Sequence, residues 1–213
     1  MAGQTIVPRS LVNPVGQTDK ISKATSAVNE SLDNTRDWLL AKIKQIPVNV
    51  AVVNGVYVNR NRYEYQISIP DLEAIVYELN LELDRIPDDV VVGQAVAAYQ
   101  NGTGLAVLNL ANISDDYTRN LTQILLSDPY QRRVALVGAR VFEEMVGFQG
   151  SFGTELARIL RGAVQDGLNP SDVTDTIASR FDISKSRAAT IARTEITGAL
   201  RRGRWDEAQD ANE

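Results

Sequence analysis

The residues best suited to chemistry lie close together near the end of the chain, in RAATIARTEITGALRRGRW (residues 187–205). Glu195, with Thr194 and Arg193 beside it, could form an acid–base set or supply the glutamate of an ADP-ribosyl transferase. Residues two positions apart on a helix point in different directions, however, so Arg193 and Glu195 do not converge on one reacting atom. The spacing therefore argues against a reaction centre at this motif.

Composition removes most other catalytic designs. The chain of 213 residues contains no cysteine and no histidine, which excludes disulfides, thiolate zinc sites, cysteine nucleophiles and histidine bases. Two acid pairs, at 88–89 and 115–116, could bind a hard cation, but each lies where the start of a helix favours negative charge. The NGTG segment at 101–104 lacks the Lys-Ser/Thr of a phosphate-binding loop. We therefore expect no enzyme, no cofactor and no metal site.

Charge is distributed unevenly along the chain. The net charge is −5, yet the segment from Ser184 to Trp205 holds a single acid and six bases: Lys185, Arg187, Arg193, Arg201, Arg202 and Arg204. A basic segment on an acidic protein suggests contact with a polyanion or an acidic partner. Pairing of these bases with acids of the same fold is the alternative. The predicted partner or nucleic-acid contacts are Lys185, Arg187, Arg201, Arg202 and Arg204.

The elements that carry these residues follow from periodicity. Residues 1–16 show no periodic pattern and predict an extended arm, and apolar spacing predicts a helix from Asp19 to Ile46. Alternating valines and tyrosines at 48–69 predict a three-stranded antiparallel meander, with a tight hairpin turn at Asn54-Gly55 and a second turn at 59–62. Its tyrosines favour cross-strand pairing over a base-stacking platform.

Further helices are expected after the meander. They are predicted from Asp71 to Ile86, over 90–100 until NGTG breaks the chain, and over 115–128 after a Ser114 cap, while 105–113 fits either helix or strand. From residue 129 onward strand signals are absent, and four helices are predicted, over 130–148, 154–167, 169–181 and 184–210. The predicted fold is α+β, with an α+β domain at 17–128 and a helical domain at 129–213.

Glu195 occupies the apolar side of the last predicted helix. It lies one turn from Ile191, Ala192 and Ala199, so we expect a buried or half-buried carboxylate that needs a basic partner. The candidate partners are Arg193, Arg158, Arg161 or the amides of a helix N-terminus. Two glycines of the same helix, Gly198 and Gly203, suggest that another backbone approaches closely.

The last third of the chain resembles the phage head morphogenesis family. These minor head proteins are similar to the F protein of phage Mu and the gene 7 product of phage SPP1. The resemblance covers about 150–210 and includes a helix, the DGLNPSDV turn, a helix ending in Phe181, a short linker and the helix with Arg193-Thr194-Glu195. The family's appendages with His or Cys residues cannot be carried over, and the predicted meander is not assigned to the family.

The resemblance implies a structural role in the virion of a tailed phage. Such proteins are present at low copy in the head and associate with portal and capsid proteins, and some contact double-stranded DNA during packaging or ejection. It implies that Arg193, Thr194 and Glu195 are packing residues, not catalysts. A head–tail connector ring and a DNA-binding helical module remain alternatives. The chain shows no secretory signal, so we expect assembly in the host cytoplasm and a place at the head or portal vertex.

Overall fold

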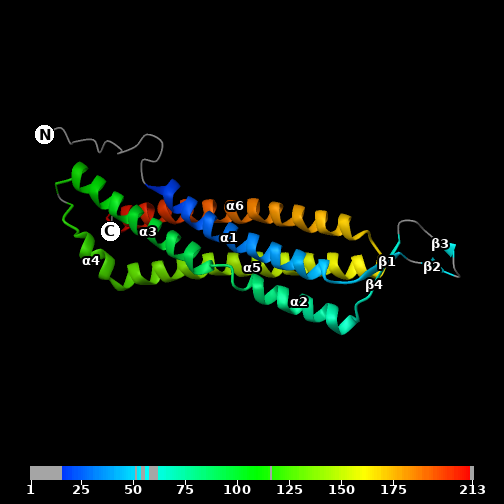
Figure 1. Ribbon diagram of the computed structural model, residues 1–213. Coiled ribbons are helices and arrows are strands. Elements are labelled where there is room, and N and C mark those ends of the chain that lie inside the picture. Colours follow the sequence, from blue (N-terminus) through cyan, green and yellow to red (C-terminus); the bar gives the residue numbers. More distant parts are fainter. Residues whose placement is uncertain (1–15, 51, 54–55, 58–61, 116, 212–213) are drawn as a thin grey trace. The chain divides into compact units, whose positions relative to one another are not determined.

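The computed structural model describes residues 16–50, 52–53, 56–57, 62–115 and 117–211, so the predicted arm lies almost wholly outside the described residues. The described chain is mostly helical (Figure 1). The helices are α1 (Gln17–Lys44), α2 (Ile69–Leu83), α3 (Asp88–Ile113), α4 (Leu121–Leu126), α5 (Asp128–Asp166) and α6 (Pro170–Asp210). The strands are β1 (Val48–Val50), β2 (Val52–Val53), β3 (Val56–Tyr57) and β4 (Tyr63–Tyr65).

The chain divides into two compact units. Unit 1 consists of Met1–Ala27, Pro87–Met145 and Ala189–Glu213, and unit 2 consists of Val28–Ile86 and Val146–Ala188. Both units take residues from each side of residue 128, because α1, α5 and α6 each contribute to both of them. Residue 128, where the sequence predicted a division, lies inside unit 1 at the first residue of α5.

The strands of unit 2 form two antiparallel pairs, β1 with β4 and β2 with β3, and do not form a three-stranded meander. β1 pairs antiparallel with β4, placing Val48 opposite Tyr65, and β2 pairs antiparallel with β3. The predicted meander is wrong in this respect, because β4 returns to β1 and is held there. The Tyr65 hydroxyl donates to Leu168 O at 2.9 Å, and Tyr63 N donates to Gly167 O at 2.9 Å. The backbone register pairs Val53 with Val56, as the predicted two-residue connection requires, although the two turn residues themselves lie outside the described residues.

The helix α3 passes through the NGTG segment without interruption, so the predicted break at 101–104 is wrong. The physical reason is the close approach of α6 within unit 1. A Cβ on Gly102 would lie 2.2 Å from Leu200 O, so the missing side chain lets the two helices meet. Ser114 ends α3 and does not cap the next helix, which begins at Leu121 behind an Asn120 cap.

Two long helices replace the four that were predicted after residue 129. α5 runs through the expected boundary at 149–153, and the Thr154 hydroxyl donates to Gly150 O at 2.9 Å where a helix cap was expected. α6 includes the predicted linker after Phe181, because Ser184 and Ala188 continue the same buried side of the helix. The end of α5 at Gly167 is confirmed by its positive φ of 65°.

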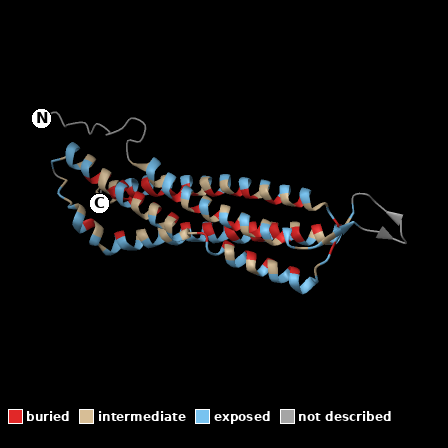
Figure 2. Cartoon of the chain, viewed as in Figure 1, coloured by how far each residue is buried: buried red, intermediate tan, exposed pale blue. Residues whose placement is uncertain are grey.

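Buried positions lie along one side of each helix, as Figure 2 shows in red. In unit 1 they include Tyr99, Val141, Met145, Ile196 and Leu200. In unit 2 the rings of Phe152 and Phe181 meet edge to face with centroids 4.9 Å apart. None of the described helices is both long and apolar enough to cross a lipid bilayer.

Candidate functional site

Glu195 is buried, as the sequence predicted. Its side chain is only 10% exposed, and Oε1 accepts a hydrogen bond from Nη2 of Arg140 at 3.2 Å. The expected partners Arg193, Arg158 and Arg161 are therefore wrong. Arg140 lies on α5 within unit 1, 55 residues earlier in the sequence, so spacing along α6 could not identify it.

The ion pair is asymmetric, which changes its energetics. The Arg140 side chain is 70% exposed, so its guanidinium stays in water while the carboxylate is enclosed. Removing Glu195 would not leave a buried cation behind, whereas removing Arg140 would leave a buried carboxylate without this partner. The other two residues of the motif, Arg193 and Thr194, are exposed.

The acidic end of α6 is packed into unit 1. Asp206 and Glu207 are buried, and each accepts a hydrogen bond from a tyrosine hydroxyl: Tyr99 donates to Asp206 at 2.8 Å, and Tyr117 donates to Glu207 at 2.6 Å. Burial raises the pKa of the Tyr99 hydroxyl well above its usual range, and the bond to Asp206 raises it further. The tyrosines therefore act as neutral donors that hold the acids in place.

An arginine fixes the last turn of α6. Arg133 donates to both carboxylate oxygens of Asp210, at 3.0 and 2.7 Å. This bidentate pair lowers the pKa of the Asp210 carboxyl, chiefly through the hydrogen bond. Arg119 lies 3.5 Å from the same carboxylate. The acidic tail is thus part of the packing of unit 1, a role that its composition alone did not indicate.

The predicted contact residues are divided between the two units. Lys185 and Arg187 belong to unit 2, while Arg201, Arg202 and Arg204 belong to unit 1. Lys185 is mostly buried and is paired with Asp33, and the hydrogen bond from Lys185 lowers the pKa of the Asp33 carboxyl. The guanidinium of Arg187 lies 5.8 Å from the centroid of the Phe148 ring and is exposed. Lys185 is therefore occupied within its own unit.

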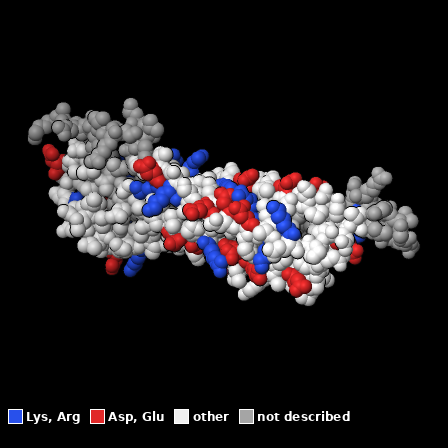
Figure 3. All heavy atoms as spheres, viewed as in Figure 1, with Lys and Arg blue, Asp and Glu red and all other residues white. Residues whose placement is uncertain are grey.

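The three arginines near the end of α6 differ in their surroundings. Nε of Arg202 donates to Asp206 Oδ1 at 3.0 Å. Arg201 and Arg204 are exposed, and no hydrogen bond or ion pair joins them to another residue in the part of the chain that the structure describes. On the face drawn in Figure 3, acidic and basic side chains are interspersed. Pairing within the fold, the alternative weighed from sequence, thus accounts for part of the basic segment.

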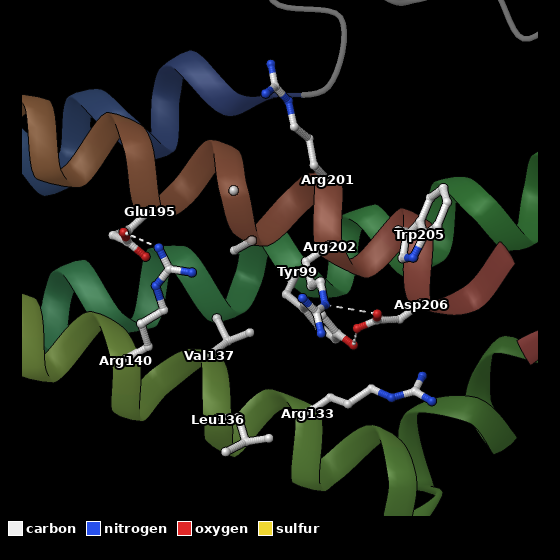
Figure 4. A pocket seen from close by; sticks show the side chains of 12 residues that line it. Tyr99, Arg133, Leu136, Val137, Arg140, Glu195, Arg201, Arg202, Trp205 and Asp206 are labelled. Atoms are coloured by element: carbon white, nitrogen blue, oxygen red, sulfur yellow. Dashed lines mark hydrogen bonds and ion pairs between the residues drawn. The ribbon is translucent and has the colours of Figure 1, made fainter. Parts of the chain in front are cut away.

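A groove lies among α3, α5 and α6, entirely within unit 1. It has a volume of roughly 520 Å³, and Figure 4 shows the side chains that line it. α5 contributes Arg133, Leu136, Val137 and Arg140, α3 contributes Tyr99, and α6 contributes Glu195, Gly198, Ala199, Arg201, Arg202, Trp205 and Asp206. Within the described ranges, no group of three or more acids lies close enough together to hold a metal ion.

Comparison of the chain with known protein families, with curated proteins and with solved structures finds no match. The resemblance to head morphogenesis proteins rests on the sequence pattern of residues 150–210. Sequence reasoning missed the groove and its α5 residues Leu136 and Arg140. Their spacing of four residues would place them on one side of a helix, but only the folded chain brings that side opposite Glu195.

Proposed function

We propose that the chain is a structural minor head protein of a tailed bacteriophage, associated with portal and capsid proteins. The observation that carries the proposal is the burial of Glu195 against Arg140. The resemblance implies that the Arg-Thr-Glu motif stabilises helix packing, and a carboxylate enclosed on the packed side of α6 fits that role. In this proposal residues 129–213 form the head-morphogenesis part, and the strands belong to the N-terminal α+β part.

The exposed residues of α5 and α6 supply surfaces for assembly contacts. Leu136, Phe142 and Trp205 are large apolar side chains exposed on unit 1. Exposed apolar side chains near arginines are common where proteins meet. This combination supports a role in an assembly.

Portal association is tested by co-expressing the chain with the portal protein encoded in the same phage genome. We expect the two to elute together in size-exclusion chromatography and to remain together at moderate salt. Leu136→Asp and Trp205→Ala should weaken the association, while an exposed change elsewhere, Gln131→Ala, should not. Separate elution of the unaltered chain and the portal protein would contradict the proposed association.

Direct contact with double-stranded DNA is a second candidate, favoured by the exposure of Arg201 and Arg204. Two phosphate contacts predict a log–log salt slope of about −2, far shallower than a full basic stripe would give. Replacing both arginines with alanine should abolish the binding and leave the helix content unchanged. Binding that does not respond to salt would dismiss this candidate.

A further inference from the structure

Part of the lining of the unit 1 groove is apolar, and the groove has space for a further side chain. Leu136 and Trp205 contribute apolar surface although they are 70% and 63% exposed, respectively. Gly198 widens the space, because a Cβ placed there would meet no atom within 4 Å. An exposed hollow with large apolar side chains is a common feature of surfaces that receive a side chain from a partner.

The groove is also bordered by guanidinium groups with unused donors. Arg140 donates through Nη2 to Glu195, and Arg202 donates through Nε to Asp206, which occupies one nitrogen of each group. A guanidinium carries five N–H donors in a planar fork. Both side chains are 70% exposed, so their remaining donors face solvent and can receive a further anion.

These features favour an acidic peptide over a nucleic acid. The lining includes the carboxylates of Glu195 and Asp206, which would repel a regular row of phosphates. A nucleic-acid backbone also offers no aliphatic group for Leu136. A peptide can place an apolar side chain against Leu136 and its carboxylates beside Arg140 and Arg202. Its carboxylates can thereby stay away from the two buried acids.

We propose that this groove binds an acidic amphipathic segment of a partner protein. An aliphatic or aromatic side chain of the segment lies over Leu136 and Gly198, and neighbouring carboxylates accept hydrogen bonds from Arg140 and Arg202. The contact is stabilised by apolar burial and by charge-assisted hydrogen bonds. This binding surface is independent of whether the chain is a head protein, because it follows from the lining of unit 1 alone.

The first part of the test selects ligands with the full-length chain. A displayed library of random peptides is panned against the unaltered chain, with counter-selection against Gly198→Leu. Leucine at 198 fills the groove and is tolerated on a helix, since no atom lies within 4 Å of its Cβ position. We expect enriched peptides to combine Asp or Glu with Leu, Ile or an aromatic residue.

The second part measures binding at the groove itself. The chain has two tryptophans, so Trp38→Phe leaves Trp205 as the sole tryptophan reporter. Titration with a selected peptide should shift Trp205 emission. Gly198→Leu and Arg202→Gln should each weaken binding about tenfold or more. The matched controls are Gly93→Leu, another exposed helical glycine with open space, and Arg204→Gln, an exposed arginine outside the lining. Both should bind as the unaltered chain does.

The proposal is overturned by any of three results: no enriched peptide, enriched peptides without acids, or binding that Gly198→Leu leaves unchanged. A Trp205 response to single-stranded DNA that exceeds the response to acidic peptides would also overturn it in favour of nucleic acid. Circular dichroism of each variant checks that a loss of binding does not come from loss of helix. Because the isolated chain is used, failure here leaves the proposed association with the phage head untouched.

Discussion

Two glycines on α6 should respond in opposite ways to the same substitution. A Cβ on Gly203 would lie 2.2 Å from Tyr99 O and 3.1 Å from Thr103 N, whereas a Cβ on Gly198 would meet nothing within 4 Å. Both residues belong to unit 1 and to the same helix. Comparing alanine at the two positions therefore separates the effect of helix propensity on stability from the effect of the close approach of α3.

The relative sizes of the helix-propensity gain and the overpacking cost decide whether alanine stabilises or destabilises the fold at each position. In a helix interior, replacing glycine with alanine stabilises by about 1 kcal/mol, and this gain applies to both positions. A carbon–oxygen contact normally measures about 3.3 Å, so at Gly203 the two backbones must separate by about 1 Å. Such overpacking costs typically ~1–3 kcal/mol, and at this position neither clashing atom can rotate aside because both belong to the backbone of α3. We expect Gly198→Ala to raise the free energy of unfolding by about 1 kcal/mol and Gly203→Ala to lower it by about 1 kcal/mol, the result of the ~1 kcal/mol gain and a middle value of the overpacking cost.

Urea denaturation followed by far-ultraviolet circular dichroism measures both changes. The difference between the two variants should be about 2 kcal/mol, since the propensity gain is common to both. Gly102→Ala, whose Cβ would lie 2.2 Å from Leu200 O, should behave like Gly203→Ala. Equal stabilisation at 198 and 203 would refute the close packing of α3 and α6.

Three further predictions concern the polar groups of unit 1. Arg140→Ala should lower the free energy of unfolding by ~1–3 kcal/mol, because it leaves the Glu195 carboxylate buried without that partner. Glu195→Ala should lower it less, by ~0.5–1 kcal/mol, since the arginine stays solvated. If urea denaturation showed Glu195→Ala to be the more destabilising of the two, the described ion pair would be contradicted. Tyr99→Phe should cost ~1–3 kcal/mol by removing the donor to buried Asp206, as measured by thermal unfolding, and an unchanged midpoint would count against that bond. Folding lowers the pKa of the Asp210 carboxyl, so its contribution is complete above the unfolded pKa of about 3.9 and is lost as the pH falls further. Asp210→Asn should therefore flatten the stability profile below about pH 4, and a profile identical to that of the unaltered chain would exclude the effect.

The sequence predicted local features better than breaks and partners. Apolar spacing placed the helix that begins near Asp19, and the burial of Glu195 followed from its place beside Ile191 and Ala192. The glycines of NGTG were interpreted as a break because glycine disfavours helices in isolation. In the fold, Gly102 is instead what allows α6 to approach α3, an interaction between segments about 100 residues apart that no local pattern contains.

The candidate site could be predicted only in part, again because its contacts join segments that are far apart in the sequence. The acid of the motif was found, but its partner Arg140 comes from α5 and its position depends on tertiary packing. Composition located the basic segment, yet charge counting could not tell that Lys185 is paired with Asp33 or that Arg202 is paired with Asp206. The groove arises where α3, α5 and α6 meet and has no signature within any one of these segments.

The most direct test of the proposed role is quantitative mass spectrometry of purified phage particles from the host in which the chain is encoded. We expect peptides from α5 and α6 at low copy relative to the major capsid protein, retained after free protein is removed by gradient centrifugation. A copy number matching the portal ring would favour the connector alternative. Particles that are fully assembled and infectious yet contain none of these peptides would contradict the assignment to the phage head.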